Sequence, residues 1–597
     1  MSLCTVFRSE NAYTTLQAVE ELRDFTGLEI DELVTFRPQR LVVHELLIRV
    51  TADLSVSDGS QYEDLGINFR RVTRIILSCY IEPHLPALEH AYEALRLRIE
   101  SHVDEEIGRL LGREEAPDVR AQSERRSRTG LGAWVGILRR APRTSTAVEP
   151  SSTPSESLDE REARAIARWQ ERSTTSEDPA AAAACRALAA AATAIRSRQG
   201  RLWGDGSLLG RVACGLACNE QGSVLLGEMI QPYILEAAPA EGLELLAAQA
   251  KPVVMNTKGA SAAGKSTLRP VQKRLAERIG VRWQDFALIS PDIWRKFLLD
   301  YESLGETYKY AGTFTGHELG IVDRKLDRYM ARKAQAGRMS HLLVDRFRFD
   351  SFATSPNVDG SSLLTRFGHV VYMFFMITPP EATVERAWQR GLDVGRYKAV
   401  DDLLDHNIEA YTGMPQLFLA LALRSDRPVH YEFLDNSVAL GERPRTIAFG
   451  RNAEMNILDV RGMLNIDRFR KIDVDATGPT EVYPDPSAMA PERNLEFLIR
   501  CASSMAKLNF ADRDSARVYA RFENGALAGI CPELLRTAVQ DADTRAAILA
   551  LAPDVLGGAS SPAQAPRTLN ESLGEDAHTV GRWGRNGKAA RAIVEAD

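Results

Sequence analysis

The sequence predicts an α/β fold: a five-stranded parallel sheet with helices on both faces, flanked by a mostly helical N-terminal region and a mixed C-terminal region. Two observations predict the sheet. Short apolar runs of strand length recur between residues 252 and 434, and helical stretches separate them. Strands that alternate with helices usually pair in parallel and are covered by those helices on both faces.

The five strands are predicted in chain order from these runs. Each contains three or more apolar or β-branched residues, and a polar or turn-forming residue ends or follows it. They are "PVVMN" at 252–256, "DFALIS" at 285–290, "HLLVD" at 341–345, "HVVYMFFMI" at 369–377 and "PVHYEFL" at 428–434.

The flanks follow from length and composition, because 597 residues are too many for one core. Two β-branched patches, at 40–54 and 71–81, suggest short strands within the first helical region. An Arg-, Ser- and Pro-rich stretch predicts a linker, and an Ala-rich stretch predicts further helices. The expected organisation is 1–112 mostly helical, 113–160 disordered linker, 161–248 helical, 249–450 α/β domain, 451–555 mixed, and 556–597 disordered tail.

Composition indicates a soluble protein of the cytoplasm. Apolar residues make up 44% and charged residues 26% of the chain, and the net charge is −7. The acidic balance argues against a general nucleic-acid binder. We find no apolar run long enough to span a membrane, no signal-peptide pattern, and seven scattered cysteines that suit a reducing compartment.

A glycine loop follows the first strand. The residues Gly259, Gly264, Lys265 and Ser266 satisfy the pattern G-x-x-x-x-G-K-[ST], and an amphipathic helix follows. Backbone N–H groups in such a loop bind phosphate oxygens, the lysine reaches the outer phosphates and the hydroxyl binds Mg²⁺. We therefore predict ATP and Mg²⁺ as cofactors. The predicted nucleotide-binding residues are Gly259, Ala260, Ser261, Ala262, Ala263, Gly264, Lys265, Ser266 and Thr267.

Two aspartates lie at the carboxyl ends of the second and third strands of the predicted P-loop kinase sheet. Asp292 lies in "SPDIW", where it would accept a proton from an attacking hydroxyl, although a helix N-cap explains it too. Asp345 ends the third strand, where a carboxylate orients magnesium or simply turns the chain.

Three arginines follow the fourth strand. Arg386 and Arg390 are four residues apart on a helix that we expect to close at Gly391, and Arg396 follows in "GLDVGR". Arginines on a helix and a mobile segment suit a phosphoryl-transfer lid, because negative charge spreads over the γ-phosphate in the transition state. The alternative is three solvated arginines.

The central 200 residues resemble the zeta-toxin family of kinases. The resemblance rests on "GASAAGKSTLRP", "ISPDIWR", the helix before "HLLVD", and "PPEATVERAWQRG". It implies a catalytic base at Asp292, stabilising arginines at Arg386 and Arg396, and a substrate contact at Glu318, with Arg390 as a further substrate contact. It also implies transfer of the γ-phosphate of ATP to a sugar-nucleotide, UDP-N-acetylglucosamine.

The chain departs from that family after the third strand. The family usually has Glu-Gly-Thr there, whereas this chain has "VDRFRF", so the acceptor is less well supported than ATP and magnesium. Two alternatives stay open: a nucleotide or polynucleotide kinase, with nucleic acid the less favoured acceptor, and a non-catalytic nucleotide switch or scaffold. We also expect the helical N-terminal region to regulate the kinase within the same chain.

Overall fold

The computed structural model describes residues 4–59, 63–111, 157–202, 206–345, 364–439, 441–556, 566–574 and 577–584. The expected linker at 113–160 therefore lies almost wholly outside the described residues. The chain forms two compact units. One contains residues 6–45 and 83–230, and the other contains residues 1–5, 46–82 and 231–597. Among the described residues, no helix is long and apolar enough to cross a membrane.

The first unit is helical. Its buried centre contains the Glu106 carboxylate, which accepts hydrogen bonds from Trp169 Nε1 at 2.8 Å and from Arg168 at 3.2 Å and pairs with Arg172. A buried carboxylate needs such partners because burial otherwise penalises its charge. The helices are α1 (Leu16–Thr26), α2 (Ile30–Leu33), α5 (Leu85–Leu110), α7 (Leu158–Thr175), α8 (Pro179–Gln199) and most of α9 (Ser207–Ala240).

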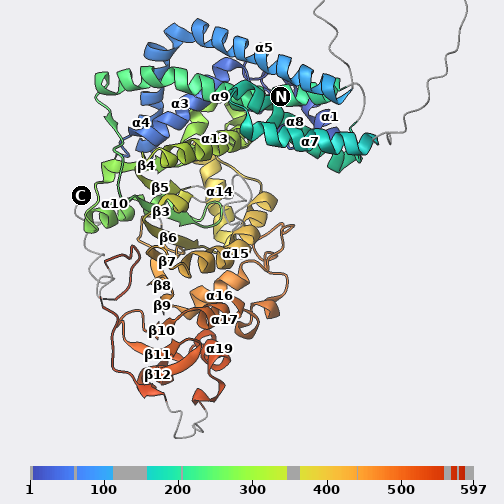
Figure 1. Cartoon of the computed structure of the whole chain (residues 1–597). Coiled ribbons are helices and arrows are strands. Elements are labelled where there is room, and N and C mark those ends of the chain that lie inside the picture. The colour runs from blue at the N-terminus through green and yellow to red at the C-terminus, as the bar shows by residue number, and fades with distance from the viewer. Residues whose placement is uncertain are drawn as a thin grey trace, which may run out of the picture. The chain divides into compact units, whose positions relative to one another are not determined.

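The second unit is a mixed α/β structure built on one eleven-stranded sheet. Its strand order is β13-β12-β11-β10-β9-β8-β7-β6-β3-β5-β4, and the strands form a continuous column in Figure 1. The strands are β3 (Val253–Lys258), β4 (Phe286–Ile289), β5 (His341–Asp345), β6 (Val370–Ile377), β7 (Val429–Asp435), β8 (Arg445–Arg451), β9 (Glu454–Ile457), β10 (Lys507–Ala511), β11 (Val518–Glu523), β12 (Ala526–Ile530) and β13 (Arg567–Thr568).

Parallel pairing joins β4, β5, β3, β6 and β7, so Val254 pairs with Leu342 on one side and with Val371 on the other. The rest of the sheet is mixed: β7, β8 and β9 pair antiparallel, β9 and β10 pair parallel, and β10, β11 and β12 pair antiparallel. The sheet is therefore larger than the five-stranded one expected. The region 451–555 continues it through β9–β12, so no break between sheets falls near residue 450.

Helices cover both faces of this sheet. On one face Gln272 of α10 (Arg269–Arg278) donates to Thr257 Oγ1 at 3.0 Å. On the other, Phe418 of α15 (Val400–Ala422) packs edge-on against Phe375. The remaining helices of the unit are α4 (Asp64–Ile75), α11 (Arg295–Leu298), α12 (Ala311–Phe314), α13 (Gly316–Gln335), α14 (Pro380–Val394), α16 (Val460–Arg468), α17 (Glu496–Ser504), α18 (Pro532–Ala538) and α19 (Ala542–Leu551).

Two expectations for the flanks are wrong. The β-branched patches at 40–54 and 71–81 are helical over nearly all their length: α3 (Pro38–Asp53) covers the first, and α4 and a following π-helical turn (Ile76–Ile81) cover the second. Most of α3 is buried, and burial on several faces overrides β propensity. From the first patch only Leu54 lies in a strand, β1 (Leu54–Ser55), which pairs with β2 (Glu244–Leu245).

The expected disordered tail is also structured in part. Over 566–574 and 577–584 it lies against the sheet: β13 pairs with β12, and the Trp583 ring lies 4.6 Å from that of Phe449. The backbone N–H groups of Val580 and Gly581 donate to the buried carboxylate of Glu432. Burial raises the pKa of Glu432 to about 7.

Candidate functional site

The glycine loop (residues 259–266) leaves β3 at the carboxyl edge of the sheet. Gly264 has a φ of 90°, which disfavours any residue with a side chain, and an added Cβ would lie 2.2 Å from Asn436 Nδ2. Asn436, just beyond β7, donates to the Ala263 carbonyl at 2.8 Å, as does Thr378 Oγ1 at 3.1 Å. The residues that directly follow β6 and β7 therefore fix the shape of this loop.

The lysine of the loop folds back over it. Lys265 Nζ donates to the carbonyls of Ala260 at 2.9 Å and Gly259 at 3.2 Å. Burial lowers the pKa of Lys265 to about 8, while the carboxylates of Asp345 and Asp292 oppose that shift. Lys265 and both predicted acidic residues therefore share one electrostatic environment.

The remaining loop residues lie around this lysine. Residues 265–268 form a 3-10 turn before α10 begins, and Pro270, near the start of α10, has no backbone N–H to donate to the Ser266 carbonyl. Thr267 Oγ1 donates to the Gly264 carbonyl at 2.7 Å. The side chains of Ala260, Ala262 and Ala263 are buried, whereas Ser261 and Ser266 are partly exposed.

Asp292 lies on a 3-10 turn (Pro291–Trp294) after β4. Its Oδ1 accepts from Arg295 Nε at 2.8 Å, and its Oδ2 pairs with Arg396. Its side chain is 41% exposed, so a hydroxyl can still reach it. Burial would raise the pKa of this carboxyl, but the surrounding guanidinium groups, Arg396 foremost and then Arg295, outweigh that effect and hold it well below its usual range.

Asp345 ends β5 in register with Thr257 of β3, two residues before the glycine loop. Its Oδ2 is buried, and among the described residues it has no hydrogen-bond partner. A buried carboxylate oxygen without a donor suits a cation. The two residues that follow, Arg346 and Phe347 in the departure from the zeta-toxin pattern, lie outside the described residues.

The three predicted lid arginines occupy different places. Arg386 Nη2 donates to the Asn436 carbonyl at 2.8 Å, beside the glycine loop. The charge of Arg390 lowers the pKa of both Lys265 and Asp292. Arg396 pairs directly with Asp292.

The expected end of the lid helix at Gly391 is wrong. α14 continues to Val394 and ends at Gly395, which adopts a left-handed conformation. Gly391 is needed for close packing instead, because an added Cβ would lie 2.7 Å from Tyr397 Cβ. The segment that carries Arg396 is held to the chain before α13, since Gly312 N donates to Gly395 O at 3.1 Å and Tyr397 N donates to Lys309 O at 3.0 Å.

Glu318 lies in the first turn of α13 and is fully buried.

The sequence analysis gave no role to two further cations, Arg295 and Lys398. Arg295 is three residues after Asp292, a spacing that places both on one face of a helical turn and could have revealed it. Lys398 Nζ lies 2.7 Å from the ring nitrogens of His406, and burial lowers the pKa of Lys398 to about 8.

A cavity of about 250 Å³ lies on the other side of the loop from Asp292, where β6, β7 and α16 meet. Asn436, which donates to the Ala263 carbonyl of the loop, lies in the chain between Asp435 and Ser437, which both line the cavity. The lining residues are Ile377, Pro379, Asp435, Ser437, Arg445, Ile447, Asp459, Arg461, Gly462, Asn465 and Phe469.

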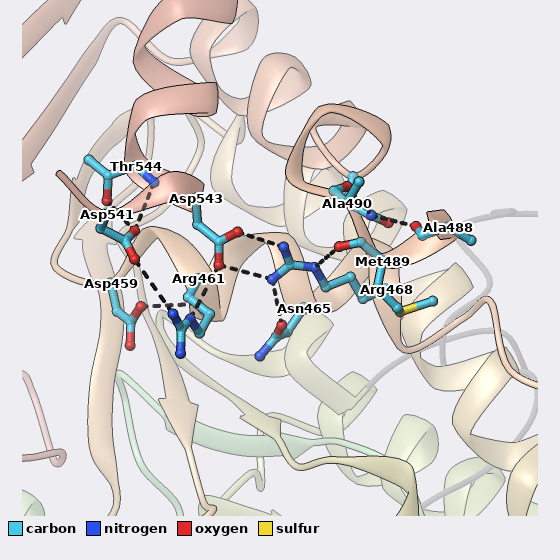
Figure 2. Close-up of polar contacts among 12 residues, drawn as sticks. Asp459, Arg461, Asn465, Arg468, Ala488, Met489, Ala490, Asp541, Asp543 and Thr544 are labelled. Atoms are coloured by element: carbon cyan, nitrogen blue, oxygen red, sulfur yellow. Dashed lines mark hydrogen bonds and ion pairs between the residues drawn. The ribbon is translucent and has the colours of Figure 1, made fainter. Parts of the chain in front are cut away.

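One wall of this cavity is held by a polar network between α16 and the start of α19. Figure 2 shows Arg461 between Asp541 and Asp543, at 3.5 and 3.2 Å, and Arg468 bound to Asp543 at 2.6 Å. Arg468 also donates to the Met489 carbonyl at 2.9 Å. The contact between Arg468 and Asp543, both largely buried, fixes the position of α16, whereas the Arg461 side chain is 67% exposed.

Comparisons with known proteins add little. No protein-family model matches the chain, and no curated protein is similar to it. A solved structure described as the native AvrRxo1-ORF1:-ORF2 complex shares 14% identity, covers 46% of this chain and 74% of its own, and has a TM-score of 0.26. That score is too low to support an argument about fold or function.

Proposed function

We propose that this chain is an ATP-dependent phosphotransferase, a P-loop kinase that moves the γ-phosphate to a hydroxyl group of a small acceptor. The observation that carries the proposal is the charge arrangement at one edge of the sheet. Lys265 of the glycine loop shares its surroundings with the Asp292 and Asp345 carboxylates and with the guanidinium groups of Arg390 and Arg396. An excess of cations around two acids suits polyphosphate and its metal.

The residues present fit ATP and magnesium. When bound, ATP would supply the phosphoryl group and Mg²⁺ would neutralise its charge. Lys265 and the backbone of the glycine loop would hold the phosphates. Asp345 Oδ2 and the Ser266 hydroxyl would hold magnesium. Among the described residues, no cluster of three His, Cys, Asp or Glu could hold a metal. Mg²⁺ often binds through one or two protein ligands, with water and phosphate completing its shell.

Asp292 would orient the acceptor hydroxyl and take its proton. Its depressed pKa makes it a weak base, and phosphoryl transfer tolerates this because its transition state is loose and positioning dominates. Arg396, which pairs with Asp292, would stabilise the phosphoryl group as it passes from donor to acceptor. Arg386, whose guanidinium group donates to the Asn436 carbonyl beside the glycine loop, would stabilise the phosphoryl group from that side.

The cavity beside the loop would take the nucleoside part of ATP. The cavity lies at the ends of β6 and β7, on one side of β3 in the sheet, and Asp292 follows β4, on the other side of β3. Phosphates bound to the glycine loop after β3 would therefore lie between the nucleoside and the acceptor. The acceptor that we propose is a sugar-nucleotide such as UDP-N-acetylglucosamine, in keeping with the zeta-toxin resemblance.

The acceptor is tested by incubating the chain with γ-labelled ATP and Mg²⁺ and separate acceptors: UDP-N-acetylglucosamine, other sugar-nucleotides, nucleosides and 5′-hydroxyl oligonucleotides. We expect label in a sugar-nucleotide. Label in a nucleoside or an oligonucleotide end instead would replace the sugar-nucleotide with the nucleotide or polynucleotide kinase alternative. ATP binding with no label anywhere would favour a nucleotide switch.

A further inference from the structure

Residues 46–82, here called the N-terminal arm, belong to the same compact unit as the glycine loop, although almost 150 residues of the other unit separate them in the chain. The arm consists of the end of α3, the short strand β1, and α4 with its π-helical turn. β1 pairs with β2, just before β3. The arm is therefore built into the sheet-containing unit.

One contact of the arm reaches the turn that carries Asp292. Trp294 Nε1 donates to Thr51 Oγ1 at 3.1 Å, and both side chains are buried, Trp294 completely. Trp294 is the last residue of the 3-10 turn that holds Asp292. A buried indole N–H without an acceptor is costly, so this bond fixes where the turn lies.

Other contacts fix the arm itself. Lys333 of α13 pairs with Asp53 at 2.9 Å, and Tyr329 of the same helix donates to Asp53. α4 packs against the Asp292 turn. The arm thus joins the Asp292 turn to α13, the helix that carries Glu318.

We propose that Thr51 is a positioning residue for Asp292, and that the N-terminal arm supports the phosphotransfer site through this one residue. This inference rests on the proposed function. Arg295 and Arg396 hold the carboxylate of Asp292. Thr51 holds the backbone of the turn that carries Asp292, because it accepts the hydrogen bond of Trp294 in that turn. Loss of the Thr51 hydroxyl lets the turn shift, and a shift of about 1 Å at a reacting group can cost up to a hundredfold in rate.

The test uses three variants of the full-length chain. Thr51→Val removes the acceptor hydroxyl and keeps the shape, and Thr51→Ser keeps the hydroxyl. Thr73→Val is the matched control, because Thr73 is fully buried in the same arm. Each hydroxyl donates to a carbonyl of its own helix at 2.7 Å, Thr73 to Phe69 and Thr51 to Leu47. Within the described residues, that is the one hydrogen bond of the Thr73 hydroxyl, which has no counterpart of the bond from Trp294. The rate of γ-phosphate release from Mg²⁺-ATP, to acceptor or to water, is measured against ATP concentration.

We expect Thr51→Val to lower kcat by roughly tenfold with an unchanged KM for ATP, because the glycine loop is untouched. Thr51→Ser and Thr73→Val should stay close to wild type. A general loss of stability would instead affect both valine variants. The Trp294 indole N–H signal, identified among seven tryptophans with Trp294→Phe, should move in Thr51→Val and stay in place in Thr73→Val.

Two failures are distinguishable. An active wild type with an equally active Thr51→Val, or an indole signal that does not move, overturns this inference and leaves the proposed function standing. A wild type that binds ATP but releases no γ-phosphate under any condition overturns the proposed function, and this inference with it.

Discussion

At the residue scale, we expect Lys265 to determine how the proposed nucleotide binding depends on pH. Its pKa of about 8 in the free protein means that the ammonium loses its proton above pH 8, and with it the attraction for phosphate. Below pH 8 the charge is present. We therefore expect the affinity for Mg²⁺-ATP to be constant between pH 6.5 and 7.5 and to fall above pH 8, by up to about tenfold per pH unit.

Calorimetric titration at a series of pH values measures this dependence. Lys265→Ala is the informative comparison, because its weak binding should lack the fall above pH 8. An equal fall in wild type and in Lys265→Ala would assign the titration to another group, with Lys398 the first alternative.

Arg396 carries a second prediction at this scale. Arg396→Ala removes a cation that contacts Asp292 and that, in the proposed reaction, would face the transferred group, so we expect kcat to fall by roughly a hundredfold or more. Arg424→Ala is a control, since Arg424 forms an ion pair with Asp426 that is exposed at the surface. Steady-state kinetics with saturating ATP measures both. Equal rates for the two variants would show that Arg396 has only a structural role.

At the scale of elements, the sequence placed the five central strands well and missed the rest of the sheet. Long apolar runs such as 369–377 identify buried strands by themselves. β13 is two residues long, and the tail around it is held by Val580 and Gly581 reaching Glu432, nearly 150 residues away. No local pattern encodes such a contact. The same limit explains why α3 was mistaken for a strand and why α14 was expected to end at Gly391.

The candidate site was predictable to the extent that its chemistry is local. The glycine loop, Asp292 and Asp345 were found because each follows a strand directly. Asn436 acts on the Ala263 carbonyl, 173 residues away in the chain, so the two become close only in the folded chain. The arm contact of Thr51 lies 243 residues from Trp294 and leaves no trace in the pattern of either segment.

The C-terminal segment supports a prediction on stability. Trp583 is buried and packs on Phe449, so Trp583→Ala should destabilise the second unit by about 3 kcal/mol. Ile499→Ala serves as the control, because Ile499 is 44% exposed on α17 and loses little packing. Thermal unfolding of both variants measures the difference. Equal melting temperatures would mean that the tail does not pack against the sheet in solution.

At the scale of the whole molecule, the division into two units limits which parts can regulate the site. The N-terminal arm belongs to the unit of the glycine loop, so it cannot serve as a detachable inhibitor. Residues 6–45 and 83–230 form their own helical unit. Regulation of the kinase by that unit stays a prediction.

The central claim is that this chain transfers a phosphoryl group with Lys265 holding the donor and Asp292 serving the acceptor. The most direct test is the transfer of labelled γ-phosphate from Mg²⁺-ATP by the wild type, Lys265→Ala and Asp292→Asn, with ATP binding measured on the same samples. We expect transfer by the wild type alone, strongly weakened binding in Lys265→Ala, and retained binding without transfer in Asp292→Asn. Transfer by Asp292→Asn at the wild-type rate would contradict this claim.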